Sequence, residues 1–235
     1  MPEPSQLLIP NTPSISFSDA CLGDDGVREI CLRLESRRDV TSLDLRGCHV
    51  HSAGAAALKS LLMGSGGRVL GSLSLEWNSL GTSDAGPRML ADAVAANVAL
   101  TSLDLRNNRM SSSAVASIAD ALRTNGTLVT LDLRWNSAGV TGGYALEAAL
   151  AENHTLIRLP LQGNRVAEST LKEINKLLAR NSAAHVASAP PRGGSAAAST
   201  DGYANIGQSA CFKLHVSTTS APLRSGPVRD GGRIE

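Results

Sequence analysis

The apolar residues of this chain recur in one fixed pattern, Leu-x-Leu-x-x-Asn, at nearly constant intervals. Five copies of the pattern begin at Leu43, Leu73, Leu103, Leu131 and Leu159, so the intervals between them are 30, 30, 28 and 28 residues. A weaker copy, Ile15-Ser-Phe-Ser-Asp-Ala20, begins 28 residues before the first of them. Positions three residues before and seven residues after each full copy starts are also apolar. The chain therefore holds six copies of one structural unit, and the first is expected to be a cap.

The pattern predicts a short strand in each unit. The two leucines point to one face of the strand and the residue between them points to the other, so one face belongs to a core and the other meets solvent. The asparagine follows the strand, where its buried amide can bond backbone groups of its own and neighbouring units, which would otherwise cost about 1–3 kcal/mol each. We expect a ladder of such side chains, formed by Cys48, Asn78, Asn108, Asn136 and Asn164.

Between the strands the apolar spacing changes to i, i+3, i+4 and i+7, which predicts helices with one buried face. These helices cover residues 53–62, 89–95, 115–122, 144–150 and 171–178. Four are expected to end at an asparagine, a residue that tolerates the left-handed conformation that stops a helix: Asn97, Asn125, Asn153 and Asn181. One strand and one helix per unit, joined by right-handed crossovers, predict an α/β leucine-rich-repeat solenoid of the ribonuclease-inhibitor-like subclass. It is expected to be a curved arc of about six repeats with a concave parallel sheet and convex helices.

The amino-acid composition of the chain changes after Asn181, where a Pro-, Gly-, Ser- and Ala-rich stretch begins. We therefore expect an N-terminal segment over residues 1–12, the repeat domain over 13–181, and a low-complexity, disordered tail over 182–235. A short strand at Cys211–Val216 is an alternative for part of the tail.

Composition narrows the function. The chain has 42% apolar residues and a formal net charge of +1, which fits a globular core and argues against nucleic acid as a partner. No apolar run approaches the ~18 residues that a membrane span needs, the N-terminus lacks the basic start of a secretory signal, and the four cysteines show no CxxC spacing. A cytoplasmic protein without a membrane contact is the expectation.

The sequence offers no strong site for chemistry. Asp104 and Asp132 form a pair of carboxylates, but nothing in the sequence buries them or places a histidine beside them. His49 and His51 lack a third metal ligand, so a surface loop is the favoured interpretation. No nucleophile elbow and no phosphate-binding loop is present. We expect no enzymatic activity, no metal and no cofactor.

Non-consensus residues of the repeats carry a family resemblance. The segments Leu73-Ser-Leu-Glu-Trp-Asn-Ser-Leu-Gly-Thr82, Leu103–Asn108 and Leu131–Asn136, with Gly142-Gly143, closely resemble the repeat domain of the family of leucine-rich repeat-containing protein 45, over roughly residues 40 to 180. That resemblance implies a place at the centrosome, basal body or cilium, as a linker and appendage component of the cytoskeleton. The family's long coiled coil has no counterpart here, so only the role of the repeat domain carries over.

Solvent-facing residues of the strands are expected to form columns on the concave face. Arg46, Glu76 and Arg106 lie on adjacent strands about 4.8 Å apart, which allows an ion-pair ladder, and aspartates in the next column can join it. A structural ladder and a recognition surface are both consistent with this pattern. The residues we predict to bind a protein partner are Trp77, Trp135, Glu76, Arg106, Arg134, Asp104 and Asp132.

Trp77 and Trp135 are the only tryptophans of the chain and occupy the same slot, just before the ladder asparagine. Two repeats separate them, which is roughly 10 Å across the sheet, with Asn107 between them. Each ring either covers the end of its own strand or anchors a partner, since tryptophan is enriched in binding hot spots.

The preferred function is a non-enzymatic protein-binding scaffold. Two other classes use the same kind of repeat: ligand-binding domains of innate receptors or ribonuclease inhibitors, and GTPase-activating proteins of the Ran type. A receptor is expected to carry a nucleotide-binding or signalling domain, and a Ran-type activator an acidic tail, whereas the tail here holds more arginine than acid. Both classes remain alternatives.

Overall fold

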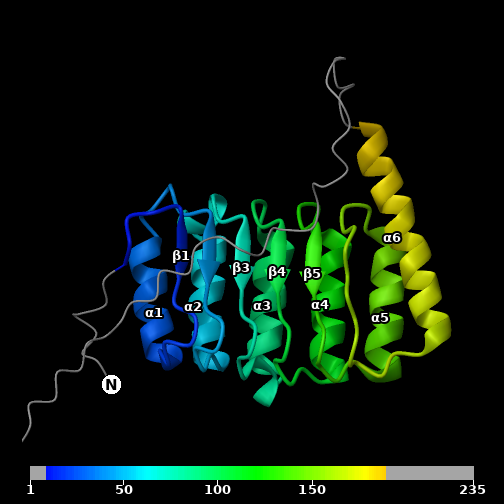
Figure 1. The fold of residues 1–235 in the computed structure, drawn as a ribbon, viewed down its shortest axis with the longest axis horizontal. Coiled ribbons are helices and arrows are strands. Elements are labelled where there is room, and N and C mark those ends of the chain that lie inside the picture. Colours follow the sequence, from blue (N-terminus) through cyan, green and yellow to red (C-terminus); the bar gives the residue numbers. More distant parts are fainter. Residues whose placement is uncertain (1–8, 189–235) are drawn as a thin grey trace, which may run out of the picture. The chain divides into compact units, whose positions relative to one another are not determined.

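A computed structural model of the chain describes residues 9–188. All the described residues belong to one compact unit. Five short strands form one parallel sheet in chain order (Figure 1): β1 (Ser14–Ser16), β2 (Ser42–Asp44), β3 (Ser72–Ser74), β4 (Ser102–Asp104) and β5 (Thr130–Asp132). The register places the first apolar residue of each unit opposite the next, beginning with Ile15 opposite Leu43. The weak first copy is therefore a true repeat.

Helices cover one face of this sheet, as Figure 1 shows for the helices behind the strands. They are α1 (Gly23–Leu34), α2 (Ser52–Met63), α3 (Ala85–Ala96), α4 (Ser112–Thr124), α5 (Gly139–Glu152) and α6 (Glu168–Ser188). The sequence pattern had not indicated α1, which gives the first unit the same strand and helix as the others. Two short 3-10 helices, Gly66–Arg68 and Leu80–Thr82, lie in the two units that are 30 residues long. The α/β repeat solenoid expected from the sequence is confirmed.

The core runs between the sheet and the helices. Both leucines of each pattern are buried, from Leu43 and Leu45 at 1% and 0% exposure to Leu159 and Leu161 at 6%. Each helix adds its inward face, as α4 does with Ile118 and neighbouring residues. Because every unit contributes to the same layer, the apolar residues form one continuous cluster rather than six separate ones.

The ladder residues lie behind the ends of the strands and are nearly inaccessible to solvent. The Asn78 amide donates to the carbonyl of Leu45 at 2.9 Å, and its oxygen accepts from the backbone N–H of Val50 at 2.9 Å. Asn164 bonds the preceding unit in the same way, through Leu133 and Ala138. Each amide thus joins its own unit to the preceding one, not to neighbours on both sides. The terminal member, Asn164, therefore makes three side-chain hydrogen bonds, as the inner Asn108 does.

The asparagines at the helix ends have a role that differs from our prediction. Asn97, Asn125 and Asn153 do follow α3, α4 and α5, but their φ and ψ values near −77° and 130° are extended, so the predicted left-handed conformation is wrong. Their amides instead bond the preceding unit: Asn125 donates to the carbonyls of Val94 at 2.7 Å and Asn97 at 3.2 Å. The oxygen of Asn125 accepts from the N–H of Leu128 at 2.8 Å. These buried residues form a second asparagine ladder at the opposite end of the units.

The prediction that the last helix ends at Asn181 is also wrong, because α6 continues to Ser188. The Asn181 amide donates to the carbonyls of Asn153 and Leu156 from inside the helix, and alanine-rich sequence follows it. Within residues 9–188, no helix is long and apolar enough to cross a bilayer. The predicted disorder of the tail beyond Ser188, the alternative strand at Cys211–Val216 and residues 1–8 lie outside the described part of the chain, and those expectations stay predictions.

Candidate protein-binding surface

The face of the sheet that the helices leave uncovered carries a continuous ion-pair network. Arg106 is its centre: it pairs with Asp104 at 2.6 Å within its own unit, with Glu76 of the preceding unit at 2.8 Å, and with Asp132 of the following unit at 3.7 Å. Arg134 pairs with Asp132 at 2.7 Å, and Arg46 with Glu76 at 3.8 Å. The in-register strands bring these charges together, as the column pattern in the sequence indicated.

Most of the charge in this network is satisfied internally. The side chains of Asp132 and Glu76 are only 12% and 15% exposed. Hydrogen bonding to Asp104 raises the pKa of Arg106, and hydrogen bonding to Asp132 raises the pKa of Arg134. Burial raises the pKa of Glu76, against an opposing effect of Arg106. The five charged residues predicted to contact a partner are therefore primarily bonded to one another.

This bonding also limits the chemistry of the two aspartates. Asp104 and Asp132 each hold an arginine at ion-pair distance, so both carboxylates are engaged in the network. The His51 ring nitrogen Nδ1 lies 2.9 Å from the carbonyl oxygen of His49, in the loop before α2. Among residues 9–188, no group of three or more potential metal ligands comes together.

One backbone slot is left-handed in all six units. It is the residue before the ladder position, with φ of 59° at Asp19, 63° at Gly47, 56° at Trp77, 55° at Asn107, 58° at Trp135 and 78° at Gly163. Backbone hydrogen bonds hold the slot in register across the sheet, because Trp77 N donates to the carbonyl of Arg106 at 3.0 Å and Asn107 N to that of Arg134 at 3.1 Å. Glycine, asparagine and aspartate tolerate this conformation, whereas a bulky residue costs about 1–2 kcal/mol there.

The two tryptophans gain little core burial in return for that cost. Trp77 is 59% exposed and Trp135 is 60% exposed. Four of the six units fill the slot with residues that suit the left-handed backbone, and Asn107 does so directly between the two rings. The fold therefore accepts small residues at this slot, and neither tryptophan is needed to fill the core.

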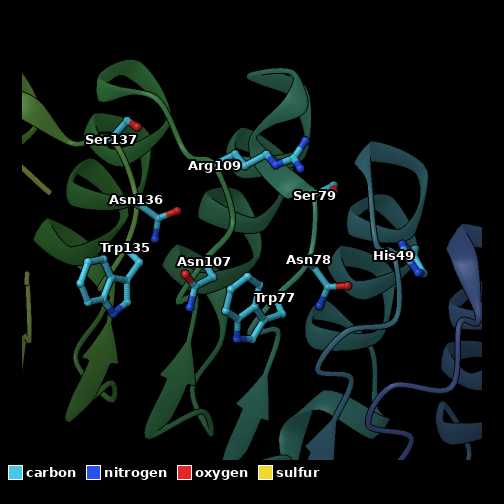
Figure 2. Close-up of a pocket in the computed structure, with 9 residues that line it drawn as sticks. All are labelled: His49, Trp77, Asn78, Ser79, Asn107, Arg109, Trp135, Asn136 and Ser137. Carbon is cyan, nitrogen blue, oxygen red and sulfur yellow. The ribbon is translucent and has the colours of Figure 1, made fainter. Parts of the chain in front are cut away.

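A groove of about 460 Å³ lies along these rings, where the strands give way to the loops that lead to the helices. Figure 2 shows both rings and Asn107 at one side of it, nearer the strands. Its lining residues are His49, Trp77, Asn78, Ser79, Asn107, Arg109, Trp135, Asn136 and Ser137. The structure thus brings Trp77 and Trp135 into one site, while the predicted charged residues Glu76, Arg106, Arg134, Asp104 and Asp132 lie outside its lining.

Sequence reasoning missed the far side of the groove, formed by the residue after the ladder position. In consecutive units that residue is His49, Ser79, Arg109 and Ser137. A basic residue follows the ladder position where the slot before it is Gly47 or Asn107, and a serine follows it where the slot is tryptophan. Tabulating this column beside the tryptophan column would have revealed the alternation.

Arg109 differs from the arginines of the sheet. Its guanidinium makes no ion pair or hydrogen bond with any described residue, and the side chain is exposed. Figure 2 shows it reaching across the loops toward Ser79, on the opposite side of the groove from the rings. No acidic residue among the described ones lines the groove. The site therefore combines two indole rings with an unpaired positive charge.

Comparisons with known proteins agree with the repeat assignment. The leucine-rich-repeat family model matches residues 38–59 and 96–119. Leucine-rich repeat-containing protein 45 of Gallus gallus is 40% identical over 97 residues, which is 41% of this chain and 14% of that protein. The chain thus matches only a small part of this relative's length.

Two solved structures share the fold. The leiomodin-1 actin-binding site 2 has a TM-score of 0.60 at 20% identity, covering 68% of this chain and 91% of that one. The tropomodulin C-terminal domain of Caenorhabditis elegans has a TM-score of 0.55 at 16% identity, covering 68% and 96%. Repeat matches, fold and relative together make this chain a leucine-rich-repeat protein whose repeats resemble those of leucine-rich repeat-containing protein 45.

Proposed function

We propose that the repeat domain is a non-enzymatic protein-binding scaffold and that the groove along Trp77 and Trp135 is its binding surface. The observation that carries the proposal is the placement of two large, exposed rings in a left-handed slot that the other units fill with small residues. A solenoid also suits such a role, because its stacked units present an extended surface without a catalytic centre. Leucine-rich-repeat domains in general serve as interaction surfaces.

The energetics of tryptophan support this role. A ring that is nearly 60% exposed offers a large area that a partner can bury, and it loses little conformational entropy on binding. Two such rings in one groove resemble the few central residues that provide most of the affinity in protein interfaces. The backbone that carries the rings is also fixed in advance, because it is bonded to the neighbouring unit.

The ion-pair network lies beside this groove and supplies polarity around the aromatic anchors. Arg134 precedes Trp135 and is one-third exposed, so a partner seated on the ring also approaches this guanidinium. We therefore retain Glu76, Arg106, Arg134, Asp104 and Asp132 as peripheral contacts that orient the partner. Their effect on binding is expected to depend on salt, as it does for charges at an interface rim.

We also propose that the protein acts at the centrosome, basal body or cilium. This part rests on the 40% identity to leucine-rich repeat-containing protein 45 and on the family resemblance of the repeats. The shared region is the repeat domain, so the proposal concerns recruitment through the repeats and not the activity of the whole relative.

Proximity labelling from the full chain tests both proposals. Cells expressing the wild-type chain are compared with cells expressing the double variant Trp77→Ala/Trp135→Ala. The control is Leu32→Ala/Val98→Ala, which removes two other large apolar side chains that are 60% and 71% exposed outside the groove. The proposal expects a set of labelled proteins, enriched in centriolar components, that the tryptophan variant loses and the control keeps. Equal labelling by all three proteins would contradict the groove, and enrichment of a GTPase would favour the Ran-type alternative.

A further inference from the structure

The spacing of the groove residues defines a periodicity that a partner must match. Trp77, Asn107 and Trp135 occupy equivalent positions in the turns that follow three neighbouring strands, β3, β4 and β5. Neighbouring strands lie about 4.8 Å apart, so the two rings are separated by roughly 10 Å. An α-helix rises about 1.5 Å per residue, so residues i and i+7 of a helix are about 10.5 Å apart on one face. A helix laid across the strands therefore presents one residue to each ring.

The unpaired guanidinium lies in the unit between the two rings. Arg109 follows the ladder residue of the same unit that contributes Asn107. Half the ring separation is about 5 Å, which equals the rise to residue i+3 or i+4 of a helix, and these residues lie on the same face as i and i+7. A carboxylate at that position can pair with Arg109 while apolar residues one turn before it and one turn after it contact the two rings.

Resting on the proposed function, we propose that the groove recognises an acidic amphipathic helix. Its contact face carries an apolar residue at i for Trp77, Asp or Glu at i+3 or i+4 for Arg109, and an apolar residue at i+7 for Trp135. The groove complements this face in charge, because His49 and Arg109 are its titratable and charged lining residues and no described acid lines it. The helix also buries the exposed rings, which the repeat domain itself leaves uncovered.

Other occupants match the groove less well. Side chains on one face of an extended strand repeat every two residues, about 6.6 Å, which fits neither the ring spacing nor its half. A nucleic acid strand has stacking bases and phosphates, but its regular charge would also run beside Glu76, Asp104 and Asp132 on the adjacent columns of the sheet. A helix instead concentrates its acid at one point of the contact, opposite Arg109.

The test uses the tryptophans as reporters, since Trp77 and Trp135 are the only two in the chain. The full chain, with its tryptophan indoles labelled with nitrogen-15, is titrated with an alanine-rich helical peptide of about 20 residues. The peptide carries leucine at i and i+7 and glutamate at i+3 and i+4. A second peptide has the same composition with the glutamates moved to the opposite face, and a single-stranded RNA oligonucleotide is the third probe.

The proposal expects both indole N–H signals to shift with the first peptide. It also expects affinity to fall at least about tenfold for the rearranged peptide and for Arg109→Gln, as the loss of a charge-assisted hydrogen bond predicts. The charge-reversed protein Arg109→Glu should regain binding to a peptide with lysine in place of glutamate. Arg165→Gln, a change of an exposed arginine in the last unit outside the groove lining, is the control and should leave affinity unchanged.

Three results would overturn this inference: equal shifts with both peptides, no shift with either, or binding of the RNA alone. None of these results bears on the proposed function, which the proximity labelling tests separately. A natural partner that Trp77→Ala/Trp135→Ala loses and Arg109→Gln retains would show a protein-binding groove with a partner of another chemistry. If both variants retained the natural partner, both proposals would be contradicted.

Discussion

The indole ring of Trp135 lies directly over Gly163, the residue that fills the equivalent slot of the next unit. A Cβ atom on Gly163 would come within 2.9 Å of the ring carbon Cδ2 and closer still to Cε3. Gly163 also has a φ of +78°, which glycine adopts at little cost. This one glycine therefore serves both the turn of its own unit and the orientation of the ring in the preceding one.

We predict that Gly163→Ala lowers the free energy of unfolding and also moves the indole. The backbone strain alone should cost about 1–2 kcal/mol, and displacement of the ring adds to it. Gly139→Ala is the matched control, because Gly139 has a φ of +60° and open space around its missing side chain. Chemical denaturation and the Trp135 indole N–H signal measure the two effects.

A double-mutant cycle isolates the ring contact. In the background of Trp135→Asn, Gly163→Ala should cost no more than Gly139→Ala does. An equal cost of Gly163→Ala with and without the ring would contradict the contact.

A second prediction concerns the first asparagine ladder. The oxygen of Asn136 accepts from the backbone N–H groups of Asn108 at 3.1 Å and Met110 at 3.0 Å, and its amide donates to the carbonyls of Leu105 and Leu133 at 2.9 Å. Asn136→Ala leaves these buried groups without partners, so we expect a loss on the order of 3 kcal/mol in the free energy of unfolding. Asn175→Ala, at an exposed site of α6, should change it by less than about 0.5 kcal/mol. Similar losses for the two variants would argue against the ladder.

A third prediction follows from the partly buried carboxyl of Glu76. Because burial raises its pKa above the usual 4.5, the folded protein holds this proton more tightly than the unfolded chain does. The contribution of Glu76 to the free energy of unfolding is therefore fully present below pH 4.5. It is lost as the pH rises through the raised pKa of the folded state. Glu76→Gln cannot release a proton, so it should remove this part of the decline in unfolding free energy.

Urea denaturation at several pH values between 4.5 and neutral measures this decline, with Glu168→Gln at an exposed site as the control for the substitution itself. Identical pH dependence in Glu76→Gln and wild type would contradict the assigned role of burial.

The cysteines give a fourth prediction. Burial raises the pKa of Cys31 and of Cys48 to about 12, so both remain thiols at neutral pH, while Cys21 is exposed. Alkylation with iodoacetamide depends on the thiolate and on access. In the folded protein we expect the reagent to modify Cys21 and to spare Cys31 and Cys48 until denaturant is added. Peptide mapping by mass spectrometry reads each site, and rapid native labelling of Cys48 would show that the cap opens readily.

Much of the fold could be predicted because the spacing of the repeated leucines indicates both the length of the repeat and the buried face of each strand. Leu43, Leu73 and Leu103 lie in register on neighbouring strands, as their spacing indicated. The second asparagine ladder could not be inferred in the same way. The propensity of a single asparagine suggests a local helix stop, whereas its actual bonds reach a carbonyl about 30 residues away and exist only after the units stack.

Part of the geometry of the candidate groove could be predicted. The equivalence of Trp77 and Trp135 was visible in the repeat alignment, but the left-handed backbone of their slot was not, since tryptophan is rarely found in that conformation. Gly47, Gly163 and Asn107 in the same column were the available signal. Arg109 could not be identified from the sequence, because what sets it apart is that it has no ion-pair partner among the described residues. That follows only from the structure, in which Glu76 and Asp104 are already paired with Arg106.

The central claim is that Trp77 and Trp135 serve recognition at a cost to the fold, and one paired measurement tests it most directly. Trp77→Asn/Trp135→Asn places in both slots the residue that already occupies the slot between them, at Asn107. The melting temperature of this full-length variant and its retention of the proximity-labelled partners are measured beside those of the wild type. We predict a melting temperature equal to or above that of the wild type, together with loss of the partners. A lower melting temperature with the partners retained would contradict the account, because the rings would then be part of the fold and recognition would lie elsewhere.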